Sequence, residues 1–434
     1  MKKYYQIILV LAFILGYSSV RAQFLMDMVD TTKDVGKGLL SIYKRFDHVR
    51  ISGYMQPQYQ VASEEGAHTY SGGDFPPHSN NRFMLRRGRI RVEYARFNDN
   101  DKPSVQFVFQ FDGTERGVFI RDFWGRAFEN KWELFAFTMG MFARPFGYEV
   151  NLSSSDREAP ERGRMSQILM KTERDLGAMV SFEPRNKKNL LRYLHIDAGF
   201  FNGQGLTNVN DFDSYKDFIS RAALKPILIG KNMWFSAGVS YFNGGFFQNG
   251  PLRYNMSTSG GKPIFVLDSS IAKIGSKVPR RYNGVDGQLK LKNGWGFTEI
   301  RGEFWNGTQT STYASSETPP FLLDPTVPYY IRPFNGGFFC FLQNIINRHH
   351  QLGLKLDWYD PNTKVKGGEI NLDNKFGPAD IKYTTLGAGY LYYINDNLKL
   401  TLWYEDVKNE KTSLPGFTED IKDNVLTCRL QFRF

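Results

Sequence analysis

Apolar and polar residues alternate with a period of two along most of the chain. In one clear case Leu352, Leu354, Leu356 and Trp358 alternate with Gln351, Gly353, Lys355 and Asp357. This period places successive side chains on opposite faces of a β-strand. The pattern and its bounding turn residues predict sixteen strands, at residues 47–61, 82–97, 103–112, 117–128, 131–143, 173–184, 190–201, 217–228, 232–242, 281–292, 295–306, 335–346, 348–359, 381–393, 397–407 and 423–434.

The connections between these strands alternate between short and long. The even-numbered connections are tight turns, such as 98–102 and 394–396, whereas all but one of the odd-numbered connections are much longer, up to the 38 residues of 243–280. Outer-membrane barrels have short periplasmic turns and long extracellular loops, and a soluble sandwich has no reason to show this order. We therefore predict an all-β fold, a sixteen-stranded antiparallel transmembrane β-barrel at residues 47–434, whose closure leaves no strand edge exposed to lipid.

The composition agrees with a barrel and excludes two other classes. The 434 residues include 41 glycines, 37 phenylalanines and 23 tyrosines, which suit turns and strands. Only one apolar run, near the N-terminus, could be considered as a membrane helix, so a helical multi-span protein is excluded. Two cysteines cannot build the disulfide framework of a small secreted domain.

The N-terminus has the three parts of a secretory signal peptide. The basic start MKKYY precedes the apolar stretch QIILVLAFILGYSSV, and Ala22 supplies a small residue for cleavage. We predict a signal peptide at residues 1–22; an uncleaved anchor is the alternative, disfavoured because the apolar run is short. The mature protein then leaves the cytoplasm, which argues against nucleic acid as a partner, and we expect it in the outer membrane of a Gram-negative bacterium.

Each end of the mature chain has a feature that predicts a role outside the barrel wall. Residues 23–46 have a loosely helical spacing and are predicted to form a short periplasmic segment, which could serve as an extension, an oligomer contact or a plug. Phe434 ends the last alternating strand. Terminal aromatic strands of this kind resemble the signal that the barrel-assembly machinery reads, and we expect this machinery to be a partner.

The chain is basic. Its formal net charge is +11, and removal of residues 1–22, which hold Lys2, Lys3 and Arg21 and no acidic residue, leaves +8. An excess of positive charge favours anionic partners. For a barrel of this class these are lipopolysaccharide and small anions.

The second predicted strand, RFMLRRGRIRVEYARF, carries the densest positive charge. If Ile90, Val92 and Tyr94 face lipid, the alternation points Arg87, Arg89, Arg91 and Glu93 into the lumen. Three arginines two residues apart then form a ladder spaced about 6.6 Å. Guanidinium groups stay charged and bind phosphate or carboxylate oxygens, which favours an anion pathway. The alternatives are a general electrostatic wall and rim arginines that bind lipopolysaccharide phosphates.

The loop at residues 144–172 combines charges of both signs. It holds Arg157, Arg162 and Arg164 together with Asp156, Glu158 and Glu161. In sixteen-stranded porins the third extracellular loop folds inward and narrows the pore. We expect either such a constriction, with charges that select ions, or a solvated loop with internal salt bridges.

Further charged residues have lumen-facing parity. The basic ones are Lys290, Arg301, Arg429 and Arg433, and the acidic ones are Asp112, Glu299, Glu303 and Glu405. The lumen is therefore predicted to be biased toward positive charge without being uniformly positive. The seven tryptophans are expected to form the two interfacial girdles and not a lumenal track for sugars.

Nothing in the sequence favours an enzyme. Among six histidines only His195 lies well inside a predicted strand, and its parity is lumenal, unlike the lipid-facing His of barrel lipid hydrolases. A nucleophile and its base must share a face, and no His, Cys or carboxylate spacing indicates a metal site. We predict no enzymatic activity, no cofactor and no metal.

Several motifs resemble those of the phosphate-selective porin O and P family, in its Bacteroidetes-like form. In order along the chain they are LRRGRIRVEY, QFVFQFDG, an RDF segment, GMFARPFGYE, SSSDREAPER and WYDPNT. The resemblance spans roughly residues 48–434, and its most specific parts are PFGYE with the loop that follows and WYDPNT at 358–363.

The resemblance implies a trimeric, sixteen-stranded, anion-preferring diffusion porin. By this resemblance the anion would be guided by six arginines: Arg87, Arg89, Arg91, Arg157, Arg162 and Arg164. The parity of the strands adds Arg301 and Arg429 to the predicted anion pathway. Phosphate-specific members line the pore with many arginines and lysines, whereas this lumen mixes acids among the bases, so strict phosphate selectivity is not predicted. A general or sugar-preferring diffusion porin and a plugged or adhesive barrel are the remaining alternatives.

Overall fold

A computed structural model describes residues 48–207 and 211–434. The predicted signal peptide at 1–22 and the segment at 23–46 lie outside the described residues. The barrel strands are β1 Val49–Ala62, β2 Asn81–Phe97, β3 Pro103–Thr114, β4 Gly117–Phe128, β5 Phe135–Ala143, β6 Arg174–Phe182, β7 Leu194–Phe201, β8 Asp217–Leu228, β9 Met233–Phe247, β12 Lys277–Asn293, β13 Gly296–Ser311, β14 Tyr329–Ile345, β15 His350–Asp360, β16 Tyr383–Asn395, β17 Leu398–Asn409 and β18 Val425–Arg433.

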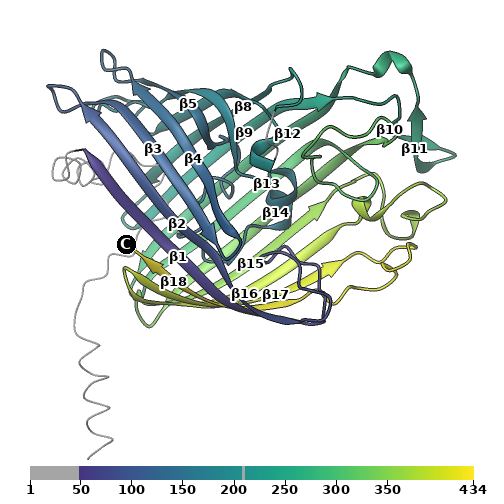
Figure 1. The fold of residues 1–434 in the computed structure, drawn as a ribbon. Helices are drawn as coiled ribbons and strands as arrows, with labels where there is room; N and C mark the ends of the chain where they lie inside the picture. Colours follow the sequence, from purple (N-terminus) through teal and green to yellow (C-terminus); the bar gives the residue numbers. More distant parts are fainter. Residues whose placement is uncertain (1–47, 208–210) are drawn as a thin grey trace, which may run out of the picture.

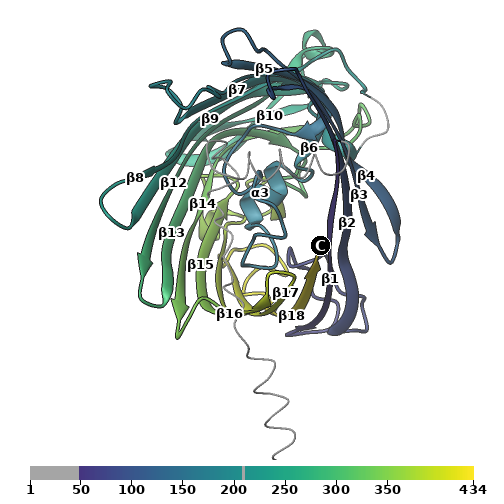
Figure 2. The ribbon, with the colours of Figure 1, turned by 90° about the vertical axis from the view of Figure 1, so that its left-hand side faces the viewer.

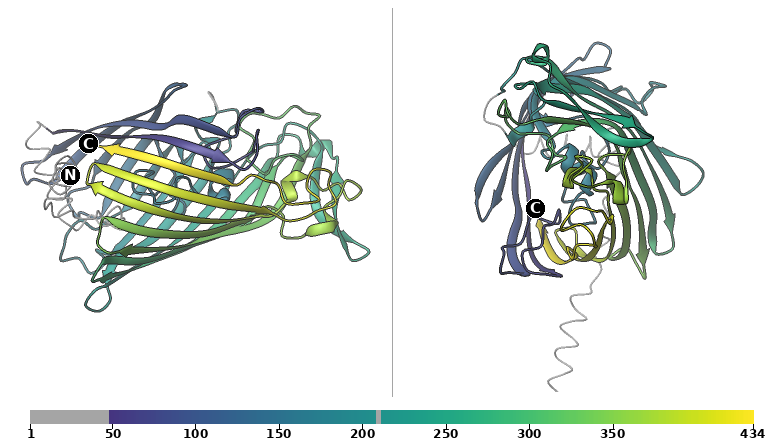
Figure 3. Two further views of the ribbon diagram at one scale, coloured as in Figure 1. Left: turned by 90° about the horizontal axis from the view of Figure 1, so that it is seen from below. Right: turned by 90° about the vertical axis from the view of Figure 1, so that its right-hand side faces the viewer.

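These sixteen strands form one closed antiparallel barrel (Figure 1). Neighbours in sequence pair with each other, β9 pairs with β12, and β1 pairs with β18 to close the sheet, with Gln58 opposite Arg429. Figure 3 shows β1 and β18 side by side at this closure. The predicted fold class is confirmed, and all sixteen predicted strands are present with ends that differ by a few residues.

Two elements were not predicted. Residues 243–280, expected to be one long loop, contain a hairpin of β10 Arg253–Ser259 and β11 Lys262–Asp268, and β10 pairs with the start of β14 in parallel. The loop after β5 contains the short helix α3 Arg164–Leu169. The remaining elements are the 3-10 turns η2 Gly205–Thr207, η3 Ile271–Lys273, η4 Gly367–Glu369 and η5 Pro378–Asp380. Within the described ranges, no helix is long and apolar enough to cross a membrane.

The alternation of the sequence separates an apolar outer surface from a polar lumen. On β15, Leu354 is 51% exposed on the outside, and its neighbour Lys355 is 6% exposed on the inside. On β2, Ile90 likewise faces outward while Arg89 is buried inside the barrel. An outward-facing apolar band on a closed antiparallel barrel is the architecture of proteins that span the bacterial outer membrane.

Not every tryptophan lies in a girdle at the membrane surface. Trp305 and Trp403 point into the barrel and are 0% and 1% exposed, so the expectation of girdles is wrong for these two. The Trp403 ring lies against the inner wall where Gly389 faces it on β16 and Gly353 follows on β15. Because these glycines have no side chain, the wall can accommodate a flat indole ring.

We predict that Gly389→Ala destabilises the barrel. A Cβ at this position would lie 2.1 Å from Trp403 Cε3 and 2.6 Å from the carbonyl oxygen of Leu402, and overpacking of this kind costs about 1–3 kcal/mol. The measurement is thermal loss of β-sheet circular dichroism in detergent, with Gly294→Ala as the control, since no heavy atom lies within 4 Å of a Cβ at Gly294. Equal melting temperatures for Gly389→Ala and Gly294→Ala would contradict the packing argument.

Candidate functional site

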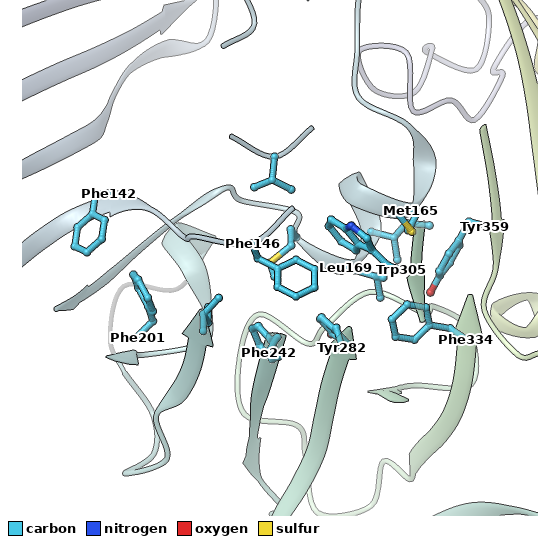
Figure 4. Packing of buried hydrophobic residues seen from close by; sticks show 14 of the residues in the cluster. Phe142, Phe146, Met165, Leu169, Phe201, Phe242, Tyr282, Trp305, Phe334 and Tyr359 are labelled. Carbon is cyan, nitrogen blue, oxygen red and sulfur yellow. The ribbon is translucent and has the colours of Figure 1, made fainter. Parts of the chain in front are cut away.

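Residues 144–173, here called the inner loop, fold back into the barrel and carry α3 into the lumen (Figure 2). The loop is held by apolar packing. Figure 4 shows Phe146 among the inward side chains of β9, β12 and β13. Its ring is fully buried and lies edge-on to Trp305 at 4.7 Å, with Phe242 and Tyr282 at 6.2 and 6.1 Å between ring centroids. Part of the lumen is therefore filled by a hydrophobic core.

The PFGYE segment begins the loop with a backbone turn that the wall holds in place. Glu303 of β13 accepts hydrogen bonds from the backbone N–H groups of Tyr148 and Glu149, at 2.8 and 2.9 Å, and from Trp305 Nε1 at 2.7 Å. Gly147 has a φ of 70°, and a Cβ there would lie 2.3 Å from Glu303 Oε1. Glycine is required because both the backbone angle and the space exclude a side chain.

Glu149 fixes the start of α3. Its carboxylate accepts hydrogen bonds from the backbone N–H of Gly163 at 3.0 Å and from Ser166 Oγ at 2.6 Å, and it pairs with Lys355 Nζ. The short helix is thus attached to β15 through a buried carboxylate. Burial raises the pKa of Glu149, but Lys355 and Arg157 outweigh it and leave this pKa below its usual value.

Most charged side chains of the inner loop pair with the barrel wall or with other loops. Glu158 binds Arg301 through two hydrogen bonds of 2.8 and 2.9 Å. Three further pairs are Asp156–Arg433 at 3.0 Å, Arg164–Asp423 at 3.4 Å and Arg162–Glu173 at 3.4 Å. Only the last of these lies within the loop, so the alternative of a solvated, internally paired loop is wrong.

Glu161 lies at the centre of a salt-bridge cluster with Arg86, Arg87 and Arg429, here called the Glu161 cluster. Arg86 and Arg87 each bind both carboxylate oxygens, at 2.6–3.1 Å, and Arg429 Nη2 binds Oε1 at 2.9 Å. Burial raises the pKa of the Glu161 carboxyl, but the three guanidinium groups outweigh it and hold that pKa well below its usual range. Glu161 is therefore ionised at neutral pH.

Sequence parity did not place Arg86 in this cluster. Adjacent arginines should point to opposite faces, but the pairing of β1 with β2 shifts register between Met55 and Pro57. Two residues of β2, Arg86 and Arg87, then stand opposite Gln56 alone, and this β-bulge lets both reach the lumen. The signal in the sequence is Pro57 on the facing strand, because a proline interrupts the ladder of backbone hydrogen bonds.

The predicted ladder points into the lumen, and each of its arginines has an acidic partner. Arg89 donates to Asp112 at 2.9 Å and also to the hydroxyls of Tyr54 and Ser154. Arg91 pairs with Glu93 and lies 3.8 Å from Asp122. The ladder is thus a row of salt bridges and not a row of free cations.

A cavity of about 350 Å³ lies on the periplasmic side of the Glu161 cluster, between the inner loop and β1–β4. Seven arginines and three carboxylates line it: Arg50, Arg89, Arg91, Arg121, Arg157, Arg174 and Arg433, with Glu93, Asp156 and Glu173. The sequence argument did not name Arg50, Arg121 and Arg174 among the lumenal residues.

Arg157 is the most unusual of these arginines. It is 6% exposed, and its Nη2 donates to the carbonyl of Leu152 at 3.2 Å. Its Nε and Nη1 have no hydrogen-bond partner among the described residues. Burial lowers the pKa of Arg157 to about 10, so the group stays charged at neutral pH. A buried guanidinium with unmade hydrogen bonds is a good site for an anion.

A second cavity, of about 600 Å³, lies on the extracellular side of the Glu161 cluster. Arg86, Arg164 and Lys171 line it together with Tyr70 and Tyr383, and the Arg164 guanidinium stacks on the Tyr383 ring at 3.5 Å. This cavity shares no lining residue with the periplasmic-side cavity.

The structure therefore divides the eight predicted site residues into three groups. Arg89, Arg91 and Arg157 line the periplasmic-side cavity, and Arg164 lines the extracellular-side cavity. Arg87 and Arg429 bind Glu161 between them. Arg162 and Arg301 line neither cavity and hold the loop in place.

The other predicted lumenal charges are also paired. Lys290 lies 3.6 Å from Glu299, which also binds Arg301, and Glu405 accepts a hydrogen bond from Ser71. His195 hydrogen-bonds to Asp197 at 2.8 Å, and Asp197 also accepts from Ser181, so the carboxylate separates the Ser from the His. Among residues 48–207 and 211–434, no group of His, Cys, Asp and Glu is arranged to hold a metal ion.

Comparisons with known proteins agree on the barrel architecture. No protein-family model and no curated protein matches the sequence. Among solved structures, the outer membrane channel DcaP of Acinetobacter baumannii is 12% identical with a TM-score of 0.51, and the match covers 89% of this chain and 97% of that chain. The anion-selective porin from Comamonas acidovorans is 9% identical with a TM-score of 0.48, covering 89% and 99%. OmpT of Vibrio cholerae is 10% identical with a TM-score of 0.48, covering 89% and 97%. At these identities the likeness concerns the fold alone: the chain shares the closed antiparallel barrel of the outer membrane channel DcaP.

Proposed function

We propose that this protein is an outer-membrane porin for the passive diffusion of small anions, phosphate among them. The observation that carries the proposal is the lining of the periplasmic-side cavity, in which seven arginines stand beside three carboxylates. Guanidinium groups in a narrow, partly desolvated lumen lower the electrostatic barrier for anions and raise it for cations. No covalent step or cofactor is needed.

The acids in the lumen limit how selective the channel is expected to be. Asp112 and Asp122 neutralise Arg89 and Arg174 from just outside the cavity lining. The net positive charge along the path is therefore small, and we expect a preference for anions and not strict phosphate selectivity. The finer resemblance to the phosphate-selective porin O and P family, and the homotrimer that it implies, remain part of this proposal.

Of the predicted pathway residues, we assign Arg87, Arg89, Arg91, Arg157, Arg164 and Arg429 to contact with the passing anion. Arg162 and Arg301 act indirectly, by holding the inner loop. Lipopolysaccharide as a surface partner and recognition of Phe434 by the barrel-assembly machinery also remain predictions.

A plugged barrel is the second candidate, and one observation favours it. The Glu161 cluster is buried and lies between the two cavities, so the inner loop narrows the lumen there. A permanent plug predicts no ionic current in a bilayer, whereas a porin predicts current with an anion-side zero-current potential.

The test is the zero-current potential of the purified protein in a planar bilayer under a potassium chloride gradient. We expect an anion-side potential for the wild type and a shift toward the cation side for Arg89→Glu, because two units of negative charge are added to the lumen. Arg96→Glu is the matched control: Arg96 lies on the same strand, but its side chain is exposed on the outer face. An unchanged potential in Arg89→Glu, or an equal shift in Arg96→Glu, would count against the lumenal pathway.

A further inference from the structure

We infer that Arg86, Arg87 and Arg429 form a binding site for a compact dianionic oxyanion, and that Glu161 occupies this site and closes the passage until such an anion displaces it. This inference rests on the proposed function, since it concerns an anion on its way through the lumen. It adds a specific binding site and a built-in competitor for that site.

The geometry around Glu161 is that of a bound oxyanion. Arg86 and Arg87 each bind both oxygens of the carboxylate, which is the bidentate arrangement with which arginine binds carboxylate and phosphate groups. Three guanidinium groups surround one negative charge, so the site keeps an excess of positive charge. A dianion such as hydrogen phosphate balances that excess better than Glu161 or chloride does.

Two of the three arginines are held in place independently of Glu161. The wall residue Gln58 accepts a hydrogen bond from Arg429 Nε at 2.8 Å, and Gln56 accepts one from Arg87 Nη1 at 3.3 Å. Arg87 and Arg429 therefore keep their places when Glu161 leaves, and a ligand that enters has to reorganise only Arg86, whose hydrogen bonds go to Glu161.

The Glu161 cluster lies where the group bound to its arginines can control passage through the lumen. Along β2 the extracellular-side cavity reaches Arg86, and the periplasmic-side cavity begins at Arg89. Along the inner loop, Arg164 lines the first cavity and Arg157 the second, and Glu161 lies between them. Two independent segments thus place the cluster between the two cavities. An anion that moves from one of these cavities to the other along β2 and the inner loop passes the groups that Glu161 now binds.

The experiment records single-channel currents of the wild type and of Glu161→Gln in planar bilayers, in potassium chloride with and without inorganic phosphate at constant ionic strength. In the wild type we expect phosphate to increase the open fraction, because it competes with Glu161. In Glu161→Gln we expect the open fraction without phosphate to rise by about tenfold or more, since charge-assisted hydrogen bonds hold the closed arrangement. Phosphate should then produce no further opening, because no carboxylate is left for it to displace.

Glu183→Gln is the matched control, because Glu183 is also a buried carboxylate paired with an arginine, Arg126, at 2.9 Å. It should behave as the wild type does. Equal open fractions in wild type and Glu161→Gln, with no response to phosphate in either, would overturn the inference, as would equal opening in Glu183→Gln. If Glu161→Gln does not fold, the inference is tested instead by the phosphate response of the wild type and by the currents of Glu161→Asp.

The same recordings separate this inference from the proposed function. An anion-side zero-current potential together with no effect of Glu161 or phosphate leaves an anion porin without the competitor site. A cation-side or null potential removes the proposed function. Silence of both the wild type and Glu161→Gln supports the permanent plug and overturns both.

Discussion

Replacing Phe146 by alanine will release the inner loop from the barrel wall. The side chain is fully buried and lies at the point where the loop meets β9, β12 and β13. Removal of a buried phenylalanine costs about 3–5 kcal/mol, which corresponds to an increase of at least about a hundredfold in the population of the undocked loop. The measurement is the rate of tryptic cleavage, because the loop carries Arg157, Arg162 and Arg164, which are buried when it is docked.

The control for this prediction is Phe137→Ala. Phe137 lies on β5, the strand that leads into the inner loop, but it faces outward and is 47% exposed. The same truncation there should leave the loop as resistant to trypsin as it is in the wild type. If Phe146→Ala is also resistant, the polar contacts of Glu149 and Glu303 hold the loop without the aromatic core.

The barrel could be predicted because every barrel strand faces two different environments. Lipid on one face and the polar lumen on the other impose the period of two directly on the sequence, as on β15. The β10–β11 hairpin was missed for the same reason. Residues such as Ser257, Thr258 and Ser259 on β10 are polar without alternation, and Phe265 on β11 is buried against Tyr330 and Phe376, not exposed to lipid. Its strands therefore carry no signature of lipid.

The candidate site could be predicted only in part. The sequence showed which arginines point inward, because that depends on parity alone. It could not show that Glu161 would bind Arg87 and Arg429, since those residues are separated by 74 and 268 positions along the chain. Arg86 was missed because a bulge breaks parity at one point. Trp305 has the same parity as Glu303, so its lumenal side could be inferred, but the sequence could not show that it would pack against Phe146 of the inner loop.

These pairings mean that the wall's arginines have a structural role as well as a role in attracting anions. Arg301 is the clearest case, because it binds Glu158 of the inner loop and Glu299 of its own strand. Both carboxylates are about 5% exposed in their side chains. A buried ion pair contributes little net stability, but loss of one partner leaves a charge without compensation.

Arg301→Met is therefore expected to lower the free energy of unfolding by about 3–5 kcal/mol, measured by urea titration of the barrel in lipid vesicles. The loss should come mainly from Glu158, because Glu299 keeps Lys290 at 3.6 Å. The double variant Arg301→Met with Glu158→Met removes both charges and should recover most of the stability, since an apolar pair of similar volume replaces a buried ion pair at little cost. A single variant as stable as the wild type would show that water reaches Glu158, and a double variant no better than the single would assign the loss to Glu299. Recovery in the double variant would establish that Arg301 and Glu158 attach the inner loop to the wall and contribute little net stability as a pair.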